Sequence, residues 1–101
     1  MKGTLIRYRT KPRSAEENQR LIENVFAELH TASPEGTRYL VLRLADGGFL
    51  HFVLEDAPGG AGAIRALPAF RAFQADIKAR TAEPVQAGET TVVGNYRMLR
   101  D

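Results

Sequence analysis

The sequence predicts a single α+β domain with the element order β-α-β-β-α-β, which is the order of a ferredoxin-like sandwich. Apolar residues recur at helical spacing in two segments, and strand-like runs flank and separate these segments. Proline and glycine divide the runs from one another. Such an order folds into a four-stranded antiparallel sheet with both helices on one face. We expect one domain over residues 1–101, a length that can bury a core without staples.

The first part of the chain supplies a strand and a helix. Residues 4–9, TLIRYR, read as a short strand. Ser14 and Glu17 have the spacing of a capping box, which marks a helix start. Over residues 15–30 a set of apolar residues recurs at helical spacing and predicts a core-facing stripe: Leu21, Ile22, Val25, Phe26 and Leu29. Proline and glycine in residues 33–36 end this helix.

Residues 38–56, RYLVLRLADGGFLHFVLED, contain two apolar runs joined by the turn sequence DGG and predict a β-hairpin. A three-residue loop over 46–48 would pair Leu42 with Phe52, with glycine supplying the positive φ. A two-residue loop would pair Leu42 with His51 instead. Matching of the apolar sets favours the three-residue loop.

The second part of the chain supplies the last helix and strand. Residues 56–67 are rich in glycine and alanine, and we expect a weakly constrained connection there. Pro68 fits the first turn of a helix over 68–80, with Phe70, Phe73 and Ile77 as a narrow apolar stripe. Pro84 follows the helix end, and a final strand is expected to centre on residues 91–98.

The two faces of the predicted sheet differ in composition, because strand side chains alternate between faces. The helix side is assigned Ile6, Tyr8, Leu40, Leu42, Leu44, Leu50, Phe52, Leu54, Val92, Gly94, Tyr96 and Met98. The open face then combines Leu5, Tyr39, Val41, Phe49, Val53 and Val93 with Arg7, Arg9, Arg43, His51, Asn95 and Arg97. This mixture is too apolar for bare solvent and too charged for a dry core, so a second subunit or a ligand should cover it.

His51 lies on the predicted open face, and the favoured register places Arg43 directly across from it. A neutral imidazole there could take a proton from an acidic phenol, while Arg43 stabilises the anion that results. These two are the candidate catalytic residues. The candidate ligand-binding residues share that face: Arg7, Tyr39, Phe49, Asn95 and Arg97. The alternative is that His51 is hydrogen-bonded in a subunit interface and the arginines pair with acidic residues.

The composition of the chain argues against several kinds of site, partner and location. The chain has no cysteine and two histidines, so thiolate chemistry is excluded and no metal site is expected. The net charge is +2 and no basic block is present, while Phe49 and Phe52 point to opposite faces; an RNA-binding sheet is therefore a weaker alternative. No apolar run approaches the roughly 18 residues of a membrane span, and no signal peptide is recognised, so a cytoplasmic location is expected.

The layout and two helix patterns, ENQRLIENVFAEL and PAFRAFQADIKAR, resemble the dimeric α/β-barrel superfamily over nearly the whole chain. Within it, antibiotic-biosynthesis-monooxygenase-like proteins are most similar in pattern. The resemblance implies a homodimer whose sheets form a barrel, with a ligand cavity between each sheet and its helices. Its haem-degrading branch uses an asparagine, a tryptophan and a helical histidine that this chain lacks at the matching places, so no cofactor is expected.

The leading interpretation is a small homodimer, joined through the open sheet face, that binds a small apolar or aromatic molecule, including anionic ones. Cofactor-independent monooxygenation is the first reaction to test, and whether the chain is an enzyme stays open at this point. The main alternative is a non-catalytic ligand-binding or structural dimer.

Overall fold

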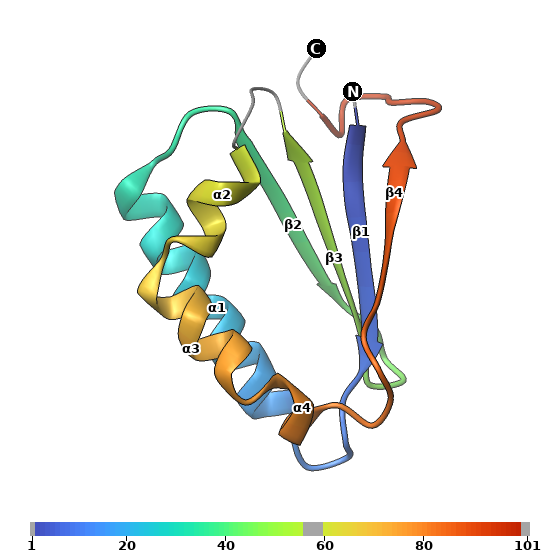
Figure 1. Cartoon of the computed structure of the whole chain (residues 1–101). Helices are drawn as coiled ribbons and strands as arrows, with labels where there is room; N and C mark the ends of the chain where they lie inside the picture. The colour runs from blue at the N-terminus through green and yellow to red at the C-terminus, as the bar shows by residue number, and fades with distance from the viewer. Residues whose placement is uncertain (1, 56–59, 100–101) are drawn as a thin grey trace.

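The computed structural model describes residues 2–55 and 60–99. Its elements are, in chain order, β1 (Lys2–Arg9), α1 (Ala15–Ala32), β2 (Thr37–Arg43), β3 (Gly48–Glu55), α2 (Gly60–Arg65), α3 (Pro68–Ala75), α4 (Ile77–Arg80) and β4 (Gln86–Thr91). The strands form one antiparallel sheet in the order β2-β3-β1-β4. All helices lie on the same side of this sheet (Figure 1). The predicted ferredoxin-like fold is confirmed.

Helix α1 follows the predicted pattern closely. It begins after Ser14 and ends before Ser33, which adopts a left-handed conformation with φ 47°. Ser14 makes no side-chain capping bond; its carbonyl accepts a hydrogen bond from the Asn18 amide instead. Ile22 and Val25 are buried, and the other predicted apolar residues pack around them. The predicted core-facing stripe is therefore confirmed.

The segment between β3 and β4 is more helical than predicted. Part of the expected connection forms α2, while residues 56–59 of that connection lie outside the described residues. The single helix predicted over 68–80 is divided into α3 and α4, because Asp76 between them has a non-helical backbone with ψ 21°. The start of α3 is fixed to α1 where the Ala69 amide donates to Glu28 Oε1 at 2.9 Å. A carboxylate in this place also suits the positive end of the helix dipole.

The final strand lies earlier than predicted. β4 ends at Thr91, and residues 92–99 form neither helix nor strand. The prediction followed the β-branched residues around position 92, whereas β4 is an edge strand that pairs with β1 through its backbone. Most of its side chains are exposed, so they carried little hydrophobic signal.

The β2–β3 turn has the predicted loop length at a shifted position. Leu44 N donates to Gly48 O at 2.8 Å, which leaves residues 45–47 as the three-residue loop. Gly47 supplies the positive φ, at 90°, as the turn requires. Because the loop begins one residue earlier than predicted, Leu42 pairs with Leu50 rather than with Phe52.

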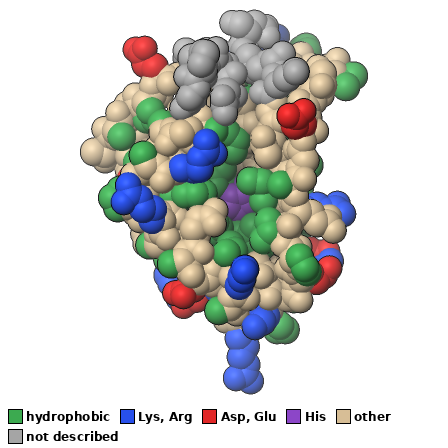
Figure 2. Space-filling model, in the orientation of Figure 1, with side chains coloured by type: hydrophobic (Ala, Val, Ile, Leu, Met, Phe, Trp, Pro, Cys, Tyr) green, Lys and Arg blue, Asp and Glu red, His purple; other side chains and the backbone are tan. Residues whose placement is uncertain are grey.

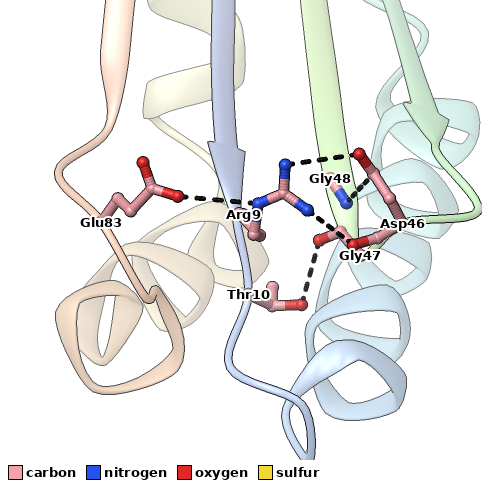
Figure 3. A network of polar contacts seen from close by, with 6 residues as sticks. All are labelled: Arg9, Thr10, Asp46, Gly47, Gly48 and Glu83. Atoms are coloured by element: carbon pink, nitrogen blue, oxygen red, sulfur yellow. Dashed lines mark hydrogen bonds and ion pairs between the residues drawn. The ribbon is translucent and has the colours of Figure 1, made fainter.

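A polar network holds this turn at one end of the sheet (Figure 3). Arg9 Nη1 donates to the Asp46 carbonyl at 2.8 Å, and its guanidinium lies 3.3 Å from the Asp46 carboxylate and 3.6 Å from that of Glu83. The amide and hydroxyl of Thr10 both donate to Gly47 O, at 3.1 and 3.3 Å. The network therefore joins β1, the hairpin turn and the connection that leads into β4.

The faces of β2 and β3 are the reverse of the prediction. Ile6 and Tyr8 face the helices as expected, but the residues directly opposite them are His51 and Phe49, and opposed residues share a face. The helix-covered face therefore carries Ile6, Tyr8, Tyr39, Val41, Phe49, His51 and Val53. The open face carries Leu5, Leu40, Leu42, Leu50, Phe52 and Arg7. Leu40 and Leu42 are 45% and 48% exposed, so these two leucines do not form the core, whereas Leu54 of β3 is buried at 1% exposure.

Candidate functional site

A cavity of about 500 Å³ lies between the sheet and helices α2, α3 and α4. We call it the covered-face cavity. Its walls are mainly apolar and include Ile6, Val53, Ile64, Phe70, Phe73 and Ile77, with polar groups from Tyr8, Tyr39 and His51. Figure 2 shows hydrophobic side chains gathered around a hollow that contains histidine surface, with basic side chains near it. The volume falls within the range of roughly 300–1,000 Å³ that is typical of small-molecule sites.

His51 is held between two tyrosines on the covered face. Its Nε2 lies 2.7 Å from the Tyr8 hydroxyl and its Nδ1 lies 2.6 Å from the Tyr39 hydroxyl. The side chain is buried, with 3% of its surface exposed, and this burial lowers its pKa to about 4, because the charged form loses its hydration. The imidazole is therefore neutral at pH 7, with one nitrogen that donates and one that accepts.

The hydrogen bonds continue from Tyr8 into the helices. Asn18 Nδ2 donates to the Tyr8 hydroxyl at 2.9 Å, and Arg80 Nε donates to Asn18 Oδ1 at 2.9 Å. Arg80 also donates through Nη2 to the Phe73 carbonyl at 2.6 Å, and its guanidinium carbon lies 5.1 Å from the centre of the Phe73 ring. We call Arg80, Asn18, Tyr8, His51 and Tyr39 the buried polar chain.

Both tyrosines of the buried polar chain are protonated at neutral pH. Burial raises the pKa of Tyr8 to about 12 and raises that of Tyr39 well above its usual range. Deprotonation would place an anion where water cannot solvate it. The buried polar chain therefore carries one charge at pH 7, the guanidinium of Arg80.

The structure brings two of the predicted site residues together and separates the rest. Tyr39 and His51 both line the covered-face cavity. Arg43 does not lie across from His51, so that predicted pairing is wrong; the shifted turn moves it two positions along the partner strand. Its Nη1 donates instead to Glu16 Oε1 at 2.8 Å and to Gln19 Oε1 at 2.7 Å.

The other predicted ligand-binding residues lie away from this cavity. Phe49 is buried in the core, stacked on Tyr8 with ring centres 5.6 Å apart. Arg7 lies on the open face, opposite Leu50. Asn95 and Arg97 follow β4 in the exposed segment over residues 92–99, and Asn95 donates to the Leu99 carbonyl. The expected cluster of these groups on one face does not form.

Two members of the buried polar chain, Asn18 and Arg80, were not predicted. Both carried a recognisable signal, because each continues the apolar stripe of its helix. Asn18 precedes Ile22 by four residues on α1, and Arg80 follows Ile77 by three. A polar residue within a core-facing stripe indicates a buried hydrogen-bonded network, since a buried polar group without a partner is costly.

Basic residues lie where the covered-face cavity meets solvent. Arg65 from α2 and Lys78 from α4 both line the cavity and are exposed. Within residues 2–55 and 60–99, no group of three or more histidine, cysteine or acidic side chains could hold a metal ion. No helix in this part of the chain is long and apolar enough to cross a membrane.

Comparison with known proteins gives a likeness of fold. No protein-family description matches the chain, and no curated protein matches its sequence. A candidate antibiotic biosynthesis monooxygenase from Nitrosomonas europaea matches at a TM-score of 0.75 and 14% identity, covering 91% of this chain and 89% of that one. Rv0793 from Mycobacterium tuberculosis matches at a TM-score of 0.74 and 16% identity, covering 93% of this chain and 96% of that one.

A mutant of SnoaB, a cofactor-independent oxygenase from Streptomyces nogalater, also has this fold. It matches at a TM-score of 0.68 and 15% identity, covering 95% of this chain and 96% of that one. The predicted resemblance to antibiotic-biosynthesis-monooxygenase structures is thus confirmed for the fold.

Proposed function

We propose that this protein binds a small, largely apolar molecule in the covered-face cavity, with a polar group of the ligand at Tyr39 and His51. The observation that carries the proposal is an apolar cavity of about 500 Å³ with a few convergent polar groups, the usual composition of a ligand site. Arg65 and Lys78 lie where an anionic substituent would reach solvent. An aromatic ligand also suits the rings of Phe70 and Phe73.

Filling the cavity tests ligand binding. Ala61 lines the cavity from α2, so an Ala61→Trp substitution should lower the affinity for a planar probe such as anthrone by at least about tenfold. Ala72→Trp is the matched control, because Ala72 is exposed on α3 outside the cavity. Equal anthrone affinities for the two variants, measured by equilibrium dialysis, would count against the covered-face cavity as the ligand site.

Cofactor-independent oxygenation is the reaction we propose to test first. Anthrone loses a proton from its central CH2 group to give a delocalised anion, which passes electrons to O2. The net change converts CH2 and O2 into C=O and H2O, so no further oxidant is needed. The support is a fold shared with a cofactor-independent oxygenase; His51 at the cavity is the base to test, and it can accept the proton once Tyr8 no longer donates to its Nε2.

Oxygen uptake with anthrone tests this reaction. Wild-type protein should consume oxygen at least about tenfold faster than buffer, and His51→Ala should lose most of that increase, as expected for a general base. His30→Ala is the matched control, since His30 is exposed at the end of α1. Equal rates for His51→Ala and wild type would reject His51 as the base.

A non-catalytic binding protein is the second candidate function. It is favoured by the hydrogen bonds on both nitrogens of His51 and by the low pKa of about 4, which makes the imidazole a weak base. Anthrone binding without oxygen uptake above the buffer rate would identify this case.

We also propose that the open face joins two copies of the chain. Leu40 and Leu42 are about half exposed there, and in the segment after β4 Val93, Tyr96 and Met98 are 100%, 79% and 80% exposed. Large exposed apolar surfaces are usually covered by a partner. Static light scattering at micromolar concentration should give twice the chain mass of 11.2 kDa; the mass of a single chain would contradict the proposal.

A further inference from the structure

The direction of each hydrogen bond in the buried polar chain can be worked out from Arg80. A guanidinium donates and never accepts, so the atom of Asn18 that meets Arg80 Nε must be its oxygen. The amide nitrogen of Asn18 then faces Tyr8, and it donates to the hydroxyl oxygen 2.9 Å away. The orientation of the Asn18 amide is therefore fixed by a neighbour that has no acceptor.

The same reasoning sets the tautomer of His51. The Tyr8 oxygen already accepts from Asn18, and the described residues offer its hydrogen one acceptor, His51 Nε2 at 2.7 Å. Tyr8 therefore donates to Nε2, which carries no proton. A neutral imidazole must then hold its proton on Nδ1, and Nδ1 donates to the Tyr39 oxygen at 2.6 Å.

Tyr39 is left with a hydrogen that it can donate. Its oxygen accepts from His51, and within residues 2–55 and 60–99 its hydroxyl has no further protein acceptor. The side chain lines the covered-face cavity. The cavity is therefore where a bound molecule would receive this hydrogen bond.

The charge at the other end of the chain strengthens this donor. Arg80 is 2% exposed, and the described residues place no carboxylate within ion-pair distance of it. Its Nη1 is buried without a hydrogen-bond partner. A buried cation without a counter-ion favours nearby negative charge, and aligned hydrogen bonds polarise one another.

We infer that the covered-face cavity selects ligands that present an acceptor oxygen, such as a carbonyl, phenolate or carboxylate, to the hydroxyl of Tyr39. A ligand whose polar group there is solely an N–H donor would face Tyr39 donor to donor. The inference rests on the proposed function, because it requires a small molecule in this cavity.

Three planar tricyclic probes of nearly equal size test the inference: 9-fluorenone presents an acceptor oxygen, carbazole presents an N–H donor, and fluorene presents neither. Equilibrium dialysis of wild-type protein should give an affinity for fluorenone at least about tenfold higher than for carbazole, because opposed donors leave one another unsatisfied. Tyr39→Phe should reduce this ratio to less than about twofold while fluorene affinity stays unchanged. Tyr96→Phe, at an exposed tyrosine, should keep the wild-type ratio.

The outcomes separate the two levels of the proposal. If none of the three probes binds, the proposed ligand site fails and the inference fails with it. If all three bind equally to wild type, the ligand site stands and the inference alone is overturned. Two-dimensional NMR of the His51 ring nitrogens provides a readout that needs no variant. A proton on Nδ1 is expected, and a proton on Nε2 would overturn the assigned direction of the hydrogen bonds in the buried polar chain.

Discussion

The two faces of this sheet come from the same strands but use opposite chemistry. On β2, Tyr39 faces the helices and binds His51, while its neighbour Leu40 faces away and is 45% exposed. The helix-covered face carries rings, hydroxyls and an imidazole, and the open face carries leucines. This difference teaches that a face of a sheet that carries leucines need not be the one its own helices cover. A face that lines a cavity needs polar groups, and the leucines of the open face are the exposed apolar surface on which the proposed dimer rests.

The largest expected effect comes from placing a charge on the open face. Leu42→Glu should convert a dimer at micromolar concentration into a monomer, because burying an unpaired carboxylate in an apolar interface costs several kcal/mol, on the order of a hundredfold or more in dissociation constant. Ala72→Glu adds the same charge at an exposed position on α3 and should remain dimeric. Light scattering that finds Leu42→Glu still dimeric would remove the open face from the interface.

On the covered face, substitution of Asn18 should lower the stability of the fold the most. Asn18→Leu removes the acceptor of Arg80 Nε and the donor to Tyr8, so it should lower the free energy of unfolding by about 3 kcal/mol. Asn24→Leu makes the same chemical change at an exposed position of α1 and should alter it by less than about 0.5 kcal/mol. Urea unfolding measures both. Similar losses for the two variants would mean that the buried polar chain does not stabilise the fold.

Acid should lower the free energy of unfolding because folding keeps His51 neutral. Its folded-state pKa of about 4 lies below its ordinary value of 6.5, so the unfolded chain takes up a proton first as the pH falls. The stabilisation that comes from the neutral imidazole is therefore fully present above pH 6.5 and is lost as the pH falls towards 4. The free energy of unfolding should decrease by about 2 kcal/mol between pH 7 and pH 5.

Two histidine variants check this pH dependence by urea unfolding at each pH. His51→Gln should remove most of the decrease, and His30→Gln should keep it. An unchanged decrease in His51→Gln would assign it to other groups.

The smallest effect is expected at the exposed network of Arg9. Its side chain is 47% exposed and those of its acidic partners are 59% and 63% exposed, so solvent screens these pairs. Arg9→Met should lower the free energy of unfolding by less than about 1 kcal/mol. A larger loss in urea unfolding would show that this end of the sheet depends on the network more than its exposure indicates.

The fold was predictable because it rests on periodicity and turns. The stripe of α1 and the glycine-containing hairpin loop place the first three strands and the first helix correctly. The edge strand β4 was misplaced because its backbone pairs with β1 while its side chains carry no alternating apolar pattern. Asp76, which divides the last predicted helix, lies among good helix formers whose pattern continues past it.

The candidate site was predictable in part. His51 and Tyr39 were recognised as chemically informative, but they were assigned to the wrong face because leucines were taken to mark the core. The turn begins one residue early, which places Arg43 away from His51. Such a shift changes no residue type and leaves apolar residues paired with apolar residues, so hydrophobic matching could not detect it.

Methyl NMR during titration with fluorenone tests the assignment of the two faces most directly. Methyl groups around the covered-face cavity, in Ile6, Val53, Ile64 and Ile77, should shift and saturate together as ligand is added. Those of Leu40 and Leu42 on the open face should stay within the linewidth. Saturable shifts of these leucines, with the cavity methyl groups unchanged, would contradict the placement of the ligand between the sheet and its helices.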